Sequence, residues 1–248
     1  MMMTVEINCD MGEGYGLYKL ANDEELMGFI TAANVACGFH ASDPVIMHKT
    51  VLLAQQYGVK VGAHPSYPDK QGFGRRFIEL SCEELRSDLI YQIGALKGFL
   101  ETLNMPLNHI KPHGALYGRA AVDEDTANVL CDVALKFKVP VYGMSGTVLE
   151  RACRQHEVEF VAEFYADLDY GDKGQLIITR EHHHIDPEQV REKMERVLHD
   201  GTVSSINGVV IPVTVQSICI HSDTPNAKEI GLAVSQTVNN YQHNKSVL

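Results

Sequence analysis

Histidine, carboxylate and lysine side chains recur at one kind of position in this chain, directly after short β-rich runs. The residues concerned are Asp10, Glu13, His40, Asp43, His64, Lys111, His113, Glu163, Asp167, His221 and Asp223. These residue types supply general acids and bases, metal ligands and a cation that can stabilise developing negative charge. Loops without a function more often carry small polar residues and glycine. The pattern therefore predicts one site assembled from several strand ends.

Strands that alternate with helices must position these residues. Strands are predicted at Val5–Asn8, Ala33–Ala36, Val59–Ala63, His109–Lys111, Val139–Tyr142, Glu159–Glu163 and Ser217–His221, with a hairpin of Val203–Ile206 and Val209–Val213 around Asn207-Gly208. Helix starts are predicted at Asp43-Pro44, Asp186-Pro187 and Thr224-Pro225, and at a capping box of Ser81 and Glu84. Such alternation is typical of parallel strands, whose carboxyl ends share one face.

The size of the chain favours a single large domain. It has 248 residues, 45% of them hydrophobic, and no low-complexity linker, so we expect one domain over residues 1–248. This length is close to the roughly 250 residues typical of a (β/α) barrel. The predicted fold is therefore α/β, an irregular and TIM-like (β/α) barrel, with a frayed tail at residues 239–248.

Charge and cysteine usage exclude some classes of partner. The formal net charge of −11 argues against nucleic acid and anionic membranes, because both bind basic surfaces. The apolar runs are too short to cross a membrane. The six cysteines form no Cys-x-x-Cys pair, and the N-terminal residues lack the pattern of a signal peptide. We expect a cytoplasmic protein with reduced thiols.

Several candidate residues also have a purely structural interpretation. Asp43 precedes a proline and could serve only as a helix cap, and His109 could be a buried strand histidine. Arg75 and Arg76 could clamp a carboxylate or phosphate, or form a solvated basic pair. Lys111 is predicted to point into the mouth of the sheet, where a desolvated lysine requires an anionic partner.

A divalent metal ion is a further interpretation of the histidines and acids, with Asp10, His40 and His64 as the candidate ligands. No His-Glu-x-x-His motif supports it, and the run His182-His183-His184 is more typical of a solvated loop. The chain also contains no Gly-x-x-x-x-Gly-Lys-Ser/Thr loop for nucleotide phosphates and no Gly-x-Ser-x-Gly elbow.

Seven segments together resemble the LamB/YcsF family, the A subunits of 5-oxoprolinase. They are residues 8–14, 33–41, 61–67, 72–76, 111–117, 163–167 and 219–225, in the family's order over nearly the whole chain. The resemblance implies a barrel similar to the glycoside hydrolase/deacetylase superfamily. It also implies ATP-dependent opening of 5-oxo-L-proline to L-glutamate, with ATP as co-substrate of a complex that contains separate B and C subunits.

Two departures from the family pattern stand out. Ser42 and Ser222 occupy positions where the family usually has glycine, and residues 181–184 replace a segment that normally contains glycine and alanine. The first change is mild, and the second concerns the structure of one loop.

The resemblance and the strand-end pattern together assign roles. The predicted catalytic residues are Asp10, Glu13, His40, His64, Lys111, His113 and Glu163. The predicted substrate-binding residues are Asp43, Arg75, Arg76, Tyr117, Asp167, His221 and Asp223. Asp10 or Glu13 would be the general base, the histidines would shuttle protons or hold a metal, and Lys111 would stabilise negative charge or bind the substrate carboxylate.

Two other classes of function remain open from the sequence. One is a stand-alone, metal-dependent hydrolase of amides or acetyl groups, which metal analysis and a chelator test on the isolated chain would identify. The other is a non-catalytic subunit that binds a small molecule or serves as a scaffold. Loss of the complex's activity on replacement of Asp10 or Lys111, with assembly intact, would argue against that second class.

Overall fold

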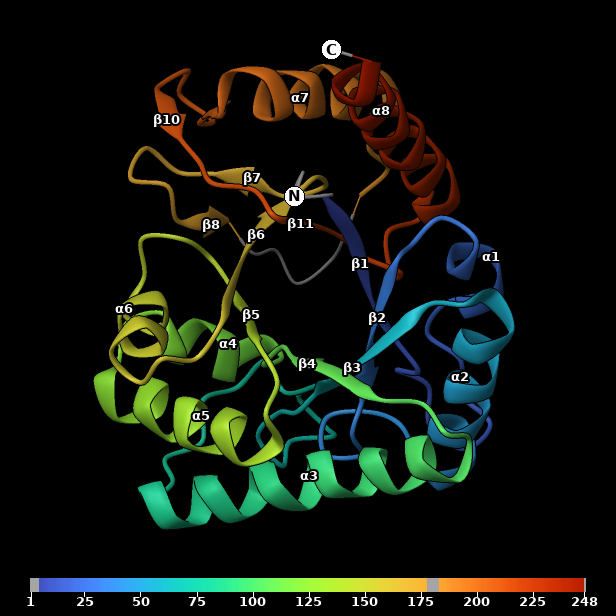
Figure 1. Ribbon diagram of the computed structural model, residues 1–248, viewed down its shortest axis with the longest axis vertical. Coiled ribbons are helices and arrows are strands. Elements are labelled where there is room, and N and C mark those ends of the chain that lie inside the picture. Colours follow the sequence, from blue (N-terminus) through green and yellow to red (C-terminus); the bar gives the residue numbers. More distant parts are fainter. Residues whose placement is uncertain (1–4, 178–182, 248) are drawn as a thin grey trace.

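A closed barrel of parallel strands forms the centre of the molecule (Figure 1). A computed structural model describes residues 5–177 and 183–247. Within them, seven strands close the barrel in the order β1-β11-β6-β5-β4-β3-β2. Their bounds are β1 Glu6–Met11, β2 Ala32–Ala36, β3 Lys60–His64, β4 Leu107–Ile110, β5 Val141–Gly143, β6 Phe160–Tyr165 and β11 Ser217–Ile220. The predicted (β/α) barrel and all its strands are confirmed, although several strand ends shift.

The strand ends shift because pairing with a neighbour, not residue type alone, decides where a strand stops. β1 continues to Met11 because residues 8–11 pair in parallel with residues 32–35 of β2. Asp10 therefore lies within β1 instead of in the loop that follows, and β6 continues beyond its predicted last residue, Glu163, to Tyr165. The barrel is irregular between β3 and β4, where the register shifts between Val61 and Ala63.

Helices cover the outside of the barrel (Figure 1). They are α1 Asp23–Met27, α2 Pro44–Tyr57, α3 Cys82–Thr102, α4 Gly114–Ala120, α5 Glu124–Phe137, α6 Val148–Gln155, α7 Pro187–Asp200 and α8 Ala227–Val247. The predicted capping box of α3 is present, and α2 ends at Gly58 in the left-handed conformation that glycine adopts without strain. On α3, Leu89, Ile93 and Leu96 are fully buried. Burial of each of these side chains contributes roughly 1.5–3 kcal/mol to the stability of the fold.

The connection from β6 to β11 departs from the simple β/α repeat. It contains the strand pair β7 Asp169–Tyr170 and β8 Leu176–Ile177, then α7, then the pair β9 Thr202–Ser204 and β10 Val210–Pro212. The predicted hairpin around Asn207-Gly208 is confirmed by the antiparallel pairing of β9 and β10. Of the unusual segment 181–184, residues 181 and 182 lie outside the described residues, and His183 and His184 are exposed.

The C-terminal helix differs from the prediction at both ends. It begins at Ala227, after a turn in which the Ala227 N–H donates to the Thr224 carbonyl, instead of at Pro225. It continues through the region predicted to be frayed, up to Val247. Gln242 donates a side-chain hydrogen bond to the carbonyl of Val5, which links this helix to the residue before β1.

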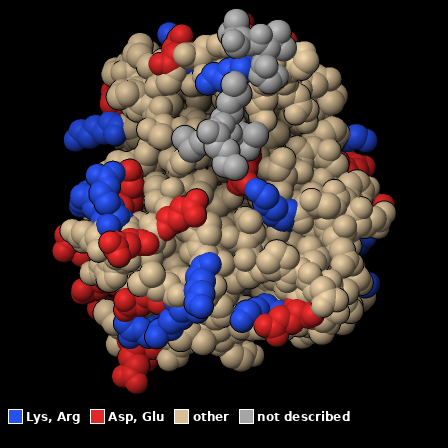
Figure 2. All heavy atoms as spheres, in the orientation of Figure 1, with Lys and Arg blue, Asp and Glu red and all other residues tan. Residues whose placement is uncertain are grey.

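The surface carries charges of both signs. Figure 2 shows Lys and Arg side chains interspersed with Asp and Glu on the described part of the face drawn there. No described helix is both long and apolar enough to cross a bilayer.

Asp43 is expected to stabilise the protein as the N-cap of α2. Its carboxylate accepts hydrogen bonds from the backbone N–H groups of Val45, Ile46 and Gly16. Asp43→Ala should therefore lower the free energy of unfolding in urea by about 1 kcal/mol. Asp43→Asn keeps an acceptor and serves as the matched control, so equal losses in the two variants would contradict the capping role.

Candidate active site

The carboxyl ends of the barrel strands open onto one pocket of about 360 Å³. Its lining includes Asp10, Glu13, His64, Arg75, Lys111, His113, Tyr117, His221 and Asp223. A larger cavity, of about 440 Å³, lies between β10 and residues 170–174 but contains none of these histidines. We take the smaller pocket as the candidate site because the buried titratable groups converge there.

The Lys111 ammonium is the charge at the centre of the site. It lies 2.8 Å from Glu163 Oε1, 3.1 Å from Asp10 Oδ1 and 3.1 Å from Cys219 Sγ, and it also donates to Asn8 Oδ1 at 3.1 Å. Its side chain is only 2% exposed. The sequence predicted a lysine that reaches for a substrate anion, whereas the described structure pairs its ammonium with carboxylates of the protein.

Burial and charge compete at this centre. Burial alone would lower the pKa of Lys111, but the negative charge of Asp10, with smaller contributions from Cys219 and Glu163, raises it well above its usual value. Burial would also raise the pKa of Asp10, yet the charges of His64 in its protonated form and of Lys111 hold it well below its usual value. Lys111 is therefore charged and Asp10 is ionised at neutral pH.

A hydrogen-bonded layer of inward-facing polar side chains supports Asp10 from below. The Asn34 amide donates to Asp10 Oδ1 and to Asn8 Oδ1, both at 2.8 Å. His109 Nε2 lies 2.6 Å from Asn34 Oδ1, and all of these side chains are buried. His109 thus serves this network, in agreement with the structural interpretation of that residue.

The sequence interpretation missed Asn8, Asn34 and Cys219 as parts of the site. Their signal was available, because an asparagine in the middle of an apolar strand is expensive to bury without partners. Tyr165 was missed as well, although its hydroxyl donates to Glu163 Oε2 at 2.9 Å, beside the hydroxyl of Tyr117 at 3.0 Å. The two tyrosines hold Glu163 in place under Lys111.

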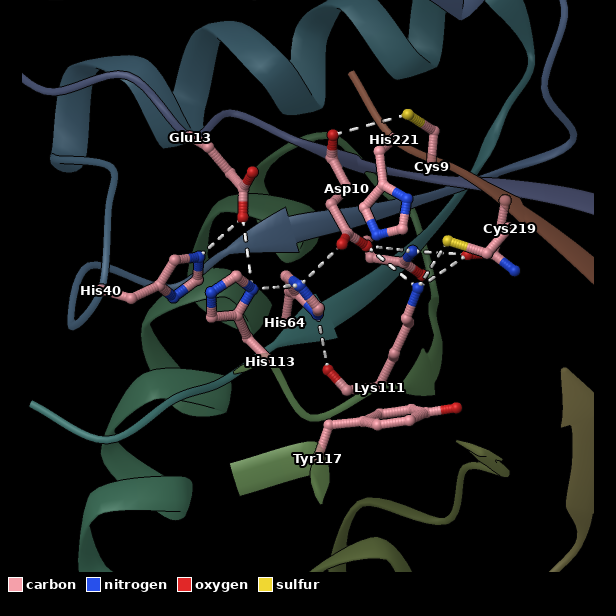
Figure 3. Close-up of polar contacts among 12 residues, drawn as sticks. Cys9, Asp10, Glu13, His40, His64, Lys111, His113, Tyr117, Cys219 and His221 are labelled. Atoms are coloured by element: carbon pink, nitrogen blue, oxygen red, sulfur yellow. Dashed lines mark hydrogen bonds and ion pairs between the residues drawn. The ribbon is translucent and has the colours of Figure 1, made fainter. Parts of the chain in front are cut away.

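Three histidines and Glu13 form a second cluster at the rim of the pocket (Figure 3). His64 Nε2 and His113 Nδ1 are 2.9 Å apart, and His113 Nδ1 is 3.4 Å from Glu13 Oε1. His40 lies behind the pocket wall, with its ring stacked on that of His113 at 3.8 Å between centroids. Its Nε2 is 2.9 Å from Glu13 Oε1. His64 also connects the two clusters, since its Nε2 is 3.3 Å from Asp10 Oδ2.

Two ion pairs lie beside the pocket. One joins residues that follow β6 and β11, and the other joins the loop after β3 to the loop after β11. His221 Nδ1 is 3.0 Å from Asp167 Oδ1, and the His221 N–H donates to the same carboxylate. Burial would lower the pKa of His221, but Asp167 outweighs it and raises the pKa to about 9. Arg75 pairs with Asp223 at 3.2 Å. Two cationic groups, Arg75 and His221, therefore line the pocket.

Three predicted substrate-binding residues do not line the pocket: Asp43, Arg76 and Asp167, the last of which pairs with His221. Asp43 caps α2, as described above. Arg76 forms an ion pair with Asp69, and its side chain is 60% exposed. Consecutive residues in the loop after β3 point in different directions, so only Arg75 of the arginine pair lines the pocket.

Comparison with known proteins places this architecture in one family. The model of the LamB/YcsF family matches residues 5–247. The chain belongs to the LamB/YcsF family. It is 44% identical over 239 residues to the lactam utilization protein lamB of Emericella nidulans, covering 95% of this chain and 94% of that protein.

Other relatives match this chain over similar lengths. The 5-oxoprolinase A subunit of Pyrococcus furiosus is 42% identical over 232 residues, covering 92% of this chain and 91% of that one. The crystal structure of the lactam utilization protein from Thermus thermophilus superposes with a TM-score of 0.88 at 37% identity, covering 97% of this chain and 98% of that chain. The fold described above is thus shared with a solved member of the family.

The loops of the LamB/YcsF motifs contain unusual backbone at the site. Ser42 has φ +70°, a left-handed conformation that glycine adopts more easily than serine. Phe73 and Gly74 are also left-handed, and the Phe73 carbonyl lies 2.8 Å from His113 Nε2. A side chain at Gly74 would overlap Ser66 and His113. This loop therefore holds the histidine cluster at the cost of backbone strain.

Possible metal ligands fall into two groups that differ from the predicted set of Asp10, His40 and His64. Within the described residues, Glu13, His40, His64 and His113 offer ligand atoms within 4.8 Å of one another. Asp10 instead groups with Cys219 and His221. The structure thus separates Asp10 from His40, because the Asp10 carboxylate turns towards Lys111 in the barrel interior.

The His221–Asp167 pair is expected to stabilise the protein in a defined pH window. The pKa of His221 is raised in the folded state, so its contribution is fully present below the unfolded value of about 6.5 and is lost as the pH rises through about 9. His221→Gln should therefore destabilise the protein more at pH 6 than at pH 10, as measured by urea unfolding of both proteins. His156→Gln, at a half-buried histidine outside the pocket, is the control. A destabilisation by His221→Gln that is independent of pH would contradict the assignment.

Proposed function

We propose that this chain is the A subunit of an ATP-dependent 5-oxoprolinase. In this proposal it opens 5-oxo-L-proline to L-glutamate, together with B and C subunits that handle ATP. The names of relatives at 39–42% identity support the reaction. The observation in this chain that supports it best is an ionised carboxylate, Asp10, held beside a buried lysine on the floor of a small pocket.

The pocket suits a compact, anionic substrate. Its volume of about 360 Å³ is at the small end of the range for ligand pockets, roughly 300–1,000 Å³. Arg75 and the cationic His221 lie on its lining, where either can attract the carboxylate of 5-oxoproline. Leu168, Leu176 and the rings of Tyr117 and Tyr165 add apolar surface to the lining, which suits the methylene groups of the substrate ring.

ATP is required because hydrolysis of an unstrained lactam to an amino acid is unfavourable without activation. The chain has no P-loop, so we propose that the partner subunits, or a site shared with them, phosphorylate the lactam oxygen. Water then adds to the activated ring carbon and gives a proton to Asp10. The carbon–nitrogen bond breaks as the nitrogen takes up the proton that Asp10 received from water, and a second water molecule releases phosphate.

Within this mechanism the buried groups have separate tasks. Asp10 is a better candidate for the general base than Glu13, because His64 and Lys111 hold its pKa low and keep it ionised, whereas burial raises the pKa of Glu13. Lys111 is a positioning residue, since its contacts are to Asp10, Glu163, Asn8 and Cys219. It keeps Asp10 ionised and in place, and Glu163 balances its charge.

A second candidate is a stand-alone, metal-dependent amide hydrolase, which the cluster of Glu13 and three histidines favours. Such an enzyme would open its substrate without ATP and without partner subunits. The two candidates therefore differ in whether opening of the substrate requires ATP and the partner subunits.

The purified chain alone is expected to show no 5-oxoproline-dependent ATP hydrolysis and no glutamate formation. Addition of B and C subunits should produce both, in a fixed ratio of ADP to glutamate. The measurement is coupled detection of ADP and glutamate with and without the partners. ATP turnover by the isolated chain would contradict the division of labour. Glutamate formation by the isolated chain without ATP would favour the second candidate.

Lys111→Met is expected to reduce kcat/KM of the reconstituted complex by roughly 100- to 1,000-fold, because Asp10 loses the charge that keeps it ionised and in place as general base. Removal of the ammonium also raises the pKa of Asp10, so the acid limb of the pH–rate profile should move to higher pH. The same change leaves two buried carboxylates unpaired and should destabilise the chain by about 3–5 kcal/mol.

A second variant separates stability from activity. Lys111→Met combined with Glu163→Gln removes one of the unpaired charges, so thermal stability should largely recover while activity stays low. Near-normal kcat/KM in either folded variant would remove Lys111 from the machinery of the site. Recovery of activity in the double variant would mean that Lys111 acts only on stability.

A further inference from the structure

Two ring nitrogens face each other in the cluster formed by Glu13 and the three histidines. His64 Nε2 and His113 Nδ1 are 2.9 Å apart. On the far side of each ring the other nitrogen lies close to a backbone carbonyl. His64 Nδ1 is 2.7 Å from the carbonyl oxygen of Lys111, and His113 Nε2 is 2.8 Å from that of Phe73.

These carbonyls determine which nitrogen of each ring carries the hydrogen. A carbonyl oxygen only accepts, so His64 Nδ1 and His113 Nε2 must be the N–H donors. In the neutral rings, His64 Nε2 and His113 Nδ1 then carry lone pairs, and both point at the same space. The assignment follows from heavy-atom positions and does not depend on placing hydrogens.

A carboxylate adds a third acceptor to the same space. Glu13 Oε1 is 3.4 Å from His113 Nδ1. His40 Nε2 lies 2.9 Å from that oxygen, and His40 Nδ1 is buried without a partner in the described structure. A hydrogen on His40 Nε2 gives the ring a donor to Glu13 and leaves only a lone pair unpaired, which costs less than an unpaired N–H. His40 thus orients Glu13, while the other three groups converge as acceptors.

Three converging acceptors in a buried site require a positive charge between them. We propose that Glu13, His64 and His113 form a binding site for one divalent transition-metal ion of the zinc class, with His40 as the supporting residue. Two imidazoles and one carboxylate are a common ligand set for such ions. Histidine ligands typically donate their second N–H to a carbonyl or carboxylate, as both do here.

The spacing of the ligand atoms fits an ion of this size. Bonds of about 2.0–2.1 Å in a tetrahedral site place neighbouring ligand atoms roughly 3.3 Å apart. The two separations measured here, 2.9 Å between the histidine nitrogens and 3.4 Å from His113 Nδ1 to Glu13 Oε1, are close to that value. All three residues line the pocket, so a fourth position would face the substrate space, as in catalytic zinc sites.

This site is not the one that the sequence suggested. Of the predicted ligands Asp10, His40 and His64, only His64 remains as a ligand. An ion here would lie next to Asp10, whose Oδ2 is 3.3 Å from His64 Nε2, and could polarise an oxygen atom in the pocket. Binding of the ion depends only on residues of this chain, so it stands or fails independently of the proposed 5-oxoprolinase activity.

The test uses the full chain, freed of metal by a chelator and then titrated with Zn²⁺ by calorimetry and with Co²⁺ by visible absorption. One equivalent should bind, and Co²⁺ should give the intense absorption bands of a four- or five-coordinate site with nitrogen ligands. Binding should weaken as the pH is lowered, because protons compete for the histidine nitrogens.

Four variants locate the ion. Glu13→Gln and His113→Gln should each weaken binding by more than the roughly 10- to 100-fold that loss of a supporting residue costs, and His40→Gln should fall within that range. The matched control His156→Gln should bind as the wild type does. Thermal melts of the metal-free variants identify any that fail to fold, and the two ligand variants provide independent tests.

Three results would overturn the proposal. The first is absence of stoichiometric binding by the wild-type chain, in which case a proton shared by His64 and His113 balances the acceptors. The second is unchanged affinity in folded Glu13→Gln and His113→Gln. The third is loss of binding in a variant of the exposed His183 and His184 with the pocket residues intact. Failure of metal binding together with ATP-dependent activity in the reconstituted complex would reject the metal site and leave the proposed function standing.

Discussion

The ammonium of Lys111 in the barrel interior is the constraint on which the rest of the site depends. A buried lysine is stable only if carboxylates surround it, and here Asp10 and Glu163 do so from two different strands. Those carboxylates in turn require donors, which Asn34, Tyr117 and Tyr165 provide. The positions of β1, β2, β4 and β6 at the carboxyl end of the barrel are thus tied to one charge.

The backbone at the end of β4, which carries this lysine, also holds the histidine cluster. The Lys111 carbonyl accepts from His64, so the backbone of the residue that supplies the buried charge also fixes the orientation of a ring in the neighbouring cluster. His64 lies between Asp10 and His113 and couples the two groups. A change in the position of β4 would therefore disturb both clusters together, although one is built on charge and the other on imidazole lone pairs.

Much of this arrangement could be predicted from the sequence. The alternation of β-rich runs with capped helices identified the barrel, because local pairing and capping signals agree with the global fold in this chain. The rule that parallel strands share a functional face then brought Asp10, His64 and Lys111 to one pocket. These inferences rest on periodicity and strand polarity, which do not depend on exact strand ends.

Other features depend on geometry that the sequence does not reveal. Whether Asn8 and Asn34 face inward is set by the tilt and register of the closed barrel, and a shift of one residue would reverse it. Asp43 and Arg76 have the right chemistry for a site, but a helix cap and the ion pair with Asp69 direct them elsewhere. The partner of Lys111 could not be predicted either, since it depends on which strand ends are neighbours in space.

The position of β11 between β1 and β6 has a consequence for synthesis of the protein. β1, which carries Asp10, is synthesised long before β11, which carries Cys219, although the two strands pair side by side in the barrel. The barrel cannot close, and the pocket cannot form, until β11 has emerged from the ribosome. A nascent chain that still lacks β11 therefore carries Asp10, Lys111 and Glu163 without the strand that closes the barrel around them, and productive folding must wait for β11.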